Sequence, residues 1–120
     1  MDIAEFTVVG DAARAKATVV DALQARKFKL TWDGEWDAVA ERGSKLANAL
    51  AGALAQYFKV TVLIRTAPDG HGLIRVEKSS KGYMGGVGGA VRTNRNFDGL
   101  VNDLQSTFGA AGVLVNVQTT

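Results

Sequence analysis

The sequence contains no cysteine, and this absence removes several kinds of chemistry at once. A chain without thiols has no disulfide, no thiolate metal site and no cysteine nucleophile. It also has a single histidine, His71, so any metal site would need carboxylates as its other ligands. We expect no metal and no other cofactor and assign no catalytic residue. We favour a protein that is not an enzyme, and an enzymatic role stays open as the alternative.

Long hydrophobic runs are also absent. No apolar stretch approaches the roughly 18 residues that a membrane-spanning helix needs. No basic stretch near the first residue leads into an apolar core of the signal-peptide type. By elimination we expect a small soluble protein of the cytoplasm. Its 120 residues, 47% of them hydrophobic, fit one domain over 1–120 that can bury one continuous core.

Neither sign of charge dominates the whole chain. The formal net charge is +2, which is too small to indicate a nucleic-acid partner by itself. The positive excess is concentrated in residues 71–95, which sum to +4, whereas residues 1–70 sum to zero and residues 96–120 to −2. We therefore expect any charged partner to be anionic and to meet the protein in the window 71–95.

The pattern at the start of the chain predicts a strand followed by a helix. Residues 5–9 form a short, β-branched run that Gly10 ends. Asp11 can cap a helix that runs to about Arg26, because its carboxylate accepts a hydrogen bond from a first-turn amide. The apolar stripe of this helix consists of Ala12, Ala15, Val19, Ala22 and Leu23.

The next segment predicts a hairpin that contains both tryptophans. Asp33-Gly34 is a favoured turn pair. A two-residue loop would pair Trp32 with Glu35, and a three-residue loop would pair Trp32 with Trp36. A slip of one residue turns every side chain to the other face of the sheet, so burial decides the register. We favour the pairing of the two tryptophans, or the shorter loop corrected by a bulge.

A second hairpin is predicted over residues 60–66 and 73–78. The turn 67–70, Ala-Pro-Asp-Gly, supplies a proline that presets φ and a glycine for the left-handed position. Pairing residue 67 with residue 71 puts the larger aliphatic side chains on one face. The predicted cross-strand pairs are Val62 with Val76 and Ile64 with Ile74.

Residues 44–58 predict a helix, since they are rich in alanine and leucine and contain no β-branched residue. Their few polar residues line one narrow stripe, so the rest of the surface is apolar. Two interpretations stay open: a core helix that lies on the sheet, or a surface through which the protein forms a homo-oligomer.

The last third of the chain predicts a loop, a helix and a strand. Residues 79–96 form the glycine-rich loop, and Asn94 or Asn96 can cap the helix that follows. We expect Gly109 to end this helix, and a short tail to follow Val117. The stripe of the helix is Phe97, Leu100, Val101, Leu104 and Phe108, and the alternating strand residues are Val113, Val115 and Val117.

These elements predict an α+β fold of the order β-α-β-β-α-β-β-α-β. Two tight hairpins make the sheet largely antiparallel, and helices on one of its faces make a two-layer sandwich. The predicted core residues are Leu30, Val62, Ile64, Ile74, Val76, Leu100, Leu104 and Phe108.

The glycine-rich segment 82–90 is the first candidate for a binding site. Glycines let backbone N–H groups approach an anion, and a following helix start adds positive potential. The segment contains no GxxxxGK[ST] motif, and Val91 stands where a dinucleotide-binding motif has its third glycine. The alternative is a mobile connection without a ligand. The candidate anion-binding residues are Lys81, Gly85, Gly86, Gly88, Gly89, Arg92 and Arg95.

The two tryptophans of the first hairpin are the second candidate. They stand among three carboxylates, Asp33, Glu35 and Asp37. Aromatic rings beside carboxylates can bind sugars or cations. A cross-strand aromatic pair that covers the sheet is the commoner arrangement.

Three functions compete on this evidence. The first is a small, non-catalytic binding or interaction module that uses the glycine-rich loop and self-association. The second is a protein, enzymatic or not, that binds a phosphate or another anionic ligand at the loop 82–90. The third is single-stranded nucleic-acid binding, ranked last because the window 71–95 contains a single aromatic residue, Tyr83, whereas stacking surfaces usually offer several.

Overall fold

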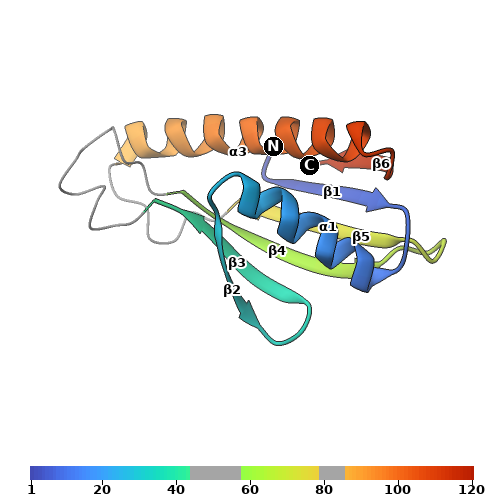
Figure 1. Ribbon diagram of the computed structural model, residues 1–120. Coiled ribbons are helices and arrows are strands. Elements are labelled where there is room, and N and C mark those ends of the chain that lie inside the picture. The colour runs from blue at the N-terminus through green and yellow to red at the C-terminus, as the bar shows by residue number, and fades with distance from the viewer. Residues whose placement is uncertain (44–57, 79–85) are drawn as a thin grey trace.

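An antiparallel sheet covered on one face by helices forms the fold (Figure 1). The computed structural model describes the backbone of residues 1–43, 58–78 and 86–120, and within these the side chains of all but residues 86–95. The described strands are β1 Ile3–Val8, β2 Lys29–Asp33, β3 Asp37–Arg42, β4 Phe58–Thr66, β5 Gly72–Lys78 and β6 Leu114–Thr119, in the order β2-β3-β4-β5-β1-β6. The described helices are α1 Ala12–Ala25 and α3 Gly86–Ala110.

The predicted class is confirmed at this level: an α+β fold with an antiparallel sheet of six described strands. The helix expected over 44–58 lies outside the described residues, apart from its last position. Phe58 is not helical but begins β4, where it is buried. Among the described residues no helix is long and apolar enough to cross a membrane.

The core lies between the sheet and the two helices. Alternate residues of the central strands are buried, as one-sided coverage of a sheet requires. Phe6 of β1 meets Phe108 of α3 edge to face, with 5.4 Å between ring centres. Seven of the eight predicted core residues are buried. The exception, Leu30, is half-buried because β2 is an edge strand at which the layer of helices ends.

Helix α1 begins and ends through local hydrogen bonds. Asp11 is its N-cap, as predicted, and the Arg14 amide donates to the Asp11 carboxylate at 2.9 Å. At the other end the Phe28 amide donates to the Leu23 carbonyl at 3.0 Å, while Lys27 takes a left-handed φ of 69°. This is the Schellman arrangement, with lysine in the position that glycine usually fills.

The β4–β5 hairpin has the predicted register. Val62 pairs with Val76 and Ile64 pairs with Ile74, and all four side chains are buried. Turn chemistry and burial indicate the same pairing here, so the local sequence pattern was sufficient to predict the register.

The β2–β3 hairpin differs from the prediction by two residues. Trp32 pairs with Ala38 rather than with Trp36, and the loop consists of residues 34–36. The prediction that the two tryptophans pair is therefore wrong, although the three-residue loop length and the face to which Trp32 points are as expected. The cause is not local: the Ile64 amide of β4 donates to the Trp36 carbonyl at 2.8 Å, which holds Trp36 in the turn.

Helix α3 begins well before the predicted cap at Asn94 or Asn96. It starts at Gly86, so residues 86–96 are helical and the predicted loop is wrong there. Asn94 and Asn96 lie inside the helix and do not cap it. Each glycine in a helix interior costs about 1 kcal/mol relative to alanine, a weak preference that tertiary context overrides.

The end of α3 also differs from the prediction. The helix continues to Ala110, and Gly112, with a φ of 74°, terminates it instead of Gly109. The Val113 amide donates to the Phe108 carbonyl at 3.1 Å, as in a Schellman motif. The predicted tail is wrong as well, because β6 extends to Thr119 beside β1.

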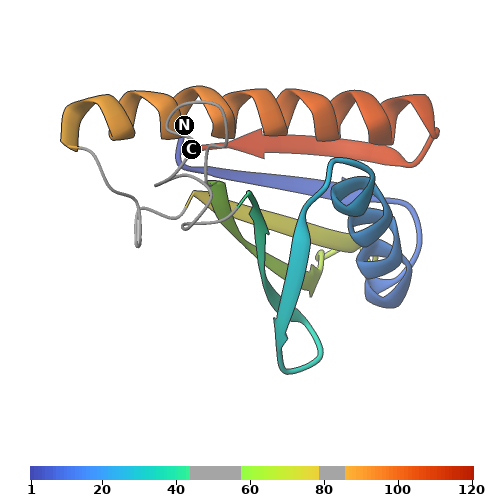
Figure 2. The ribbon, with the colours of Figure 1, turned by 60° about the vertical axis from the view of Figure 1, so that its left-hand side comes forward.

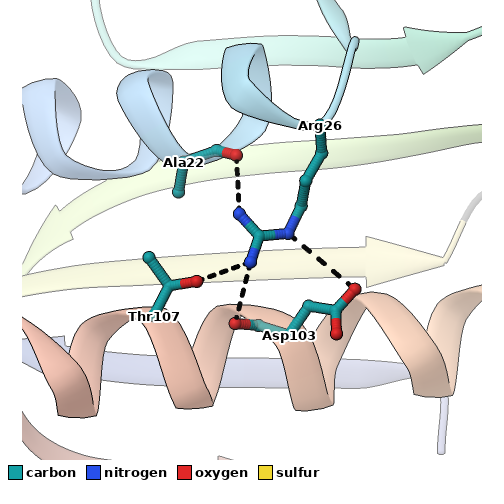
Figure 3. A network of polar contacts seen from close by, with 4 residues as sticks. All are labelled: Ala22, Arg26, Asp103 and Thr107. Carbon is teal, nitrogen blue, oxygen red and sulfur yellow. Dashed lines mark hydrogen bonds and ion pairs between the residues drawn. The ribbon is translucent and has the colours of Figure 1, made fainter.

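A single arginine joins the ends of the two helices (Figure 3). The Arg26 guanidinium donates to the carbonyl of Ala22 at 2.9 Å within its own helix. Across the gap it donates to the Thr107 hydroxyl at 2.5 Å and to the Asp103 carbonyl at 3.2 Å. These contacts hold α1 and α3 beside each other over the sheet.

Candidate functional site

Five of the seven residues predicted to bind an anion lie in a described part of the chain. Lys81 and Gly85 lie outside the described residues. The other five belong to the first turns of α3: Gly86, Gly88, Gly89, Arg92 and Arg95. The glycine run therefore supplies the start of a helix rather than a loop from residue 86 onward.

Two of the positive charges in the window 71–95 are paired within the sheet. The Lys78 ammonium lies 2.7 Å from the Asp2 carboxylate, and this hydrogen bond and charge lower the pKa of Asp2 below its ordinary value. The Arg75 guanidinium lies between Glu5, at 3.7 Å, and Glu77, at 3.5 Å. These acidic neighbours reduce the charge that the window offers to an outside anion.

His71 belongs to the β4–β5 turn. Its backbone N–H donates to the Asp69 carboxylate at 3.0 Å, and its carbonyl accepts from the Ala67 amide at 2.8 Å. In the part of the chain that the structure describes, no three histidine or acidic side chains are grouped so that they could hold a metal ion.

An open pocket lies at the β2–β3 turn. It has a volume of about 550 Å³ and is lined from three elements: Ala12 at the start of α1, residues 33–37 of the hairpin, and residues 64–66 at the end of β4. Figures 1 and 2 show the hairpin projecting away from α3 on the side of the sheet where α1 lies. None of the residues that line the pocket belongs to the glycine-rich segment 82–90.

The backbone of the turn is determined by two features. Gly34 has a φ of 83°, which a residue with a side chain rarely adopts, and nothing lies within 4 Å of the position where its Cβ would be. The hydrogen bond from Ile64 to the Trp36 carbonyl then ties the turn to β4. Together they present Trp36 and the neighbouring carboxylates at the rim of the sheet.

Negative charge is in excess in the lining of the pocket. Arg65 donates to the Asp37 carboxylate at 2.7 Å, so this pair is internally balanced. Asp33 and Glu35 are exposed, and neither has an ion pair among the residues that the structure describes. Three carboxylates against one guanidinium give the lining a formal charge of −2.

Lys16 of α1 contacts this site from one side. Its ammonium lies 4.2 Å from the ring centre of Trp32 and 5.4 Å from that of Trp36. It also donates to the backbone carbonyl of Glu35 at 2.6 Å. Both tryptophans are half-buried and pack against the core, although they are not the cross-strand pair that was predicted. The cation at their rings belongs to the chain itself, so binding of a sugar or cation ligand stays a prediction.

Sequence reasoning missed Lys16 and Arg65 as members of the site. Lys16 follows Ala12 by four residues, which puts both on the same side of α1, but nothing local indicates that this side meets the hairpin. Arg65 stands two residues from the β4–β5 turn, and only the order of the strands brings it beside Asp37.

Comparison with known proteins adds no relative: no family model matches the sequence, and a search of the curated proteins finds no match. The pocket combines one aromatic wall, two carboxylates without an ion pair among the described residues, and one internally paired guanidinium.

Proposed function

We propose that the protein is a small, non-catalytic binding module whose ligand site is the pocket at the β2–β3 turn. The observation that carries the proposal is the composition of this pocket: Trp36 beside Asp33 and Glu35, carboxylates that have no ion pair among the described residues. Ligand sites are typically concave and combine apolar or aromatic surface with a few polar groups that orient the ligand. A volume of about 550 Å³ suits a small molecule or a single side chain of a larger partner.

The test is an NMR titration of the 15N-labelled protein with a panel of amines, amino-acid amides, neutral sugars, sugar phosphates and nucleotides. A ligand of the pocket should shift the amides of residues 34–37 and Thr66, and should leave those of the β4–β5 turn at 69–71 in place. It should also raise the unfolding temperature in proportion to its occupancy. Ligands that shift amides elsewhere and none in the pocket would contradict the proposal.

A second candidate function, anion binding, is supported by where α3 begins. Because the helix starts at Gly86, its first-turn amides come from the glycine run, and they carry the positive end of the helix dipole. Arg92 and Arg95 follow within three turns. A phosphate-bearing ligand or a single-stranded oligonucleotide is the partner that this charge suits.

The anion hypothesis is tested with the double variant Arg92→Glu/Arg95→Glu. Titrations with phosphate-bearing ligands and with oligonucleotides are run at low salt and near physiological salt, where the Debye length is about 8 Å. Binding that survives physiological salt and is lost in the double variant supports this function. Equal binding by the double variant removes it.

A further inference from the structure

We infer that the ligand of the hairpin pocket is an organic cation, an ammonium or guanidinium group that lies against Trp36 and pairs with Asp33 and Glu35. The inference rests on the proposed function and names the class of ligand. It assigns to Lys16 the role of an internal cation that competes for the same aromatic surface.

The negative charge of the pocket lining favours a cation as the ligand. The Asp37 carboxylate is neutralised by Arg65 at 2.7 Å, whereas Asp33 and Glu35 remain available beside it. An anionic ligand would have to approach both carboxylates, and a neutral ligand would gain nothing from their charge. A cation gains from both, and this attraction is strongest at low ionic strength.

The chain already places a cation at the two tryptophan rings. The Lys16 ammonium lies over Trp32 at 4.2 Å and near Trp36 at 5.4 Å, within the range of favourable cation–π contact. The ring faces and the Glu35 carbonyl thus form a surface that accepts an ammonium group. Trp36 belongs both to this surface and to the lining of the pocket.

Lys16 does not occupy the side-chain carboxylates of the pocket. Its hydrogen bond goes to the Glu35 backbone carbonyl at 2.6 Å and not to a carboxylate. An incoming cation can therefore pair with the Asp33 and Glu35 side chains, while it competes with Lys16 for the tryptophan face. Removal of the Lys16 ammonium should strengthen binding, since it removes both the competitor and a repelling charge.

The experiment compares choline with its neutral isostere 3,3-dimethyl-1-butanol, and guanidinium chloride at low millimolar concentration with sodium chloride at equal ionic strength. Binding is followed by the amide shifts of residues 34–37. The sequence contains two tryptophans, both in this hairpin, so intrinsic fluorescence reports directly on the site. We expect the cations to bind, and the isostere and sodium to bind at least tenfold more weakly.

Three variants separate the contributions. Asp33→Asn/Glu35→Gln should weaken cation binding about tenfold, whereas Asp21→Asn/Asp98→Asn, which removes the same charge from exposed helical positions, should change it less than twofold. Lys16→Met keeps the apolar stem without the ammonium, and it should raise affinity about two- to fivefold, the scale of one exposed cation–π contact. The four acidic residues are exposed and Lys16 is half-buried, so circular dichroism verifies the fold of each variant.

The outcomes separate this inference from the function on which it rests. Equal binding of choline and its isostere, or equal loss in the two acidic double variants, overturns the cationic ligand. Unchanged affinity in Lys16→Met overturns the competition. A neutral or anionic ligand that shifts residues 34–37 would refute the inference and leave the binding function in place, whereas the absence of any ligand at the pocket refutes both.

Discussion

Lys27 has a left-handed backbone conformation, which residues with a side chain seldom adopt. Its φ of 69° is the single positive value at a non-glycine position among the described residues. The conformation is imposed by the end of α1, where the Lys27 amide donates to Gln24 and the Phe28 amide donates to Leu23, both at 3.0 Å. The buried ring of Phe28 holds the chain in this path, because it must reach the core directly after the helix.

Lys27→Gly is therefore expected to stabilise the protein, unlike most glycine substitutions. The left-handed conformation costs a residue with a Cβ roughly 1–2 kcal/mol, and glycine removes this cost. Glycine also makes the unfolded chain more flexible, which offsets part of the gain. We expect a net gain of about 0.5–1 kcal/mol in the free energy of unfolding, measured by urea denaturation. The control Lys29→Gly, at a strand position, should lower the free energy of unfolding. A loss of stability in both variants would show that the backbone of Lys27 is not strained.

The Asp2–Lys78 pair predicts a pH effect of known sign. The hydrogen bond and charge of Lys78 lower the pKa of Asp2 in the folded state. A carboxyl whose folded pKa is depressed contributes stability above its unfolded pKa, and that contribution is lost as the pH falls through the folded value. NMR titration of Lys78→Met should show the Asp2 pKa returning upward toward its ordinary value. An unchanged Asp2 titration curve would refute the assignment of cause.

At the scale of elements, α1 packs closely against the start of β5. Gly72 begins β5, and a Cβ at this position would lie 2.5 Å from the Ala15 Cβ and 2.8 Å from the Asp11 carbonyl oxygen. The Gly72 amide also donates to the Gly10 carbonyl at 2.8 Å. The position of α1 over the sheet therefore depends on the absence of a side chain at residue 72.

Gly72→Ala is expected to destabilise the protein by about 1–3 kcal/mol, because backbone and helix must move apart to admit one methyl group. Gly99→Ala is the matched control. It lies on an exposed side of α3 with nothing within 4 Å of the new Cβ, and it should stabilise the helix by about 0.5–1 kcal/mol. If both variants change the free energy of unfolding in the same direction, close packing at Gly72 is not the cause of the effect of Gly72→Ala.

The apolar stripe of α3 is the second contact between layers. Leu104 is fully buried and lies between Val101 and Phe108 on the face that covers the sheet. Leu104→Ala should cost about 2–5 kcal/mol, the range for large-to-small changes in a core. An unfolding midpoint that does not move would show that this stripe is not part of the core. Gln105→Ala, at the exposed neighbouring position, serves as the control.

At the scale of the whole molecule, the first and last strands of the chain meet at one edge of the sheet, where β6 is the edge strand. β1 lies between β5 and β6, so the first strand and the last are neighbours, and the Thr120 amide donates to the Ile3 carbonyl at 2.9 Å. Figures 1 and 2 show the two termini side by side. One buried cluster includes side chains from both helices and from all the central strands.

A single core of this kind predicts one cooperative unfolding transition. Tryptophan fluorescence reports on the β2–β3 hairpin at one edge of the sheet, and far-ultraviolet circular dichroism reports on the helices and strands together. The two denaturation curves should coincide, as in a two-state domain. An earlier fluorescence transition would show that the hairpin, and with it the pocket, unfolds separately.

The sequence by itself determined the features that depend on neighbours along the chain. The Asp11 cap, the stripes of α1 and α3, and the β4–β5 register follow from hydrogen bonds and periodicity within a few residues. The α+β class follows from the same local signals. The presence of tryptophan beside carboxylates at a turn could likewise be seen in the sequence.

Only the tertiary structure decided what depends on contacts between distant segments. Pairing with β4 moved the turn of the first hairpin, and helical structure extends through glycines that local propensity disfavours. The order of the strands brought Arg65 to Asp37, and the path of α1 brought Lys16 to the two tryptophans. A pocket built from three elements has no signature in any one of them, since its residues meet only once the sheet and the helix have packed.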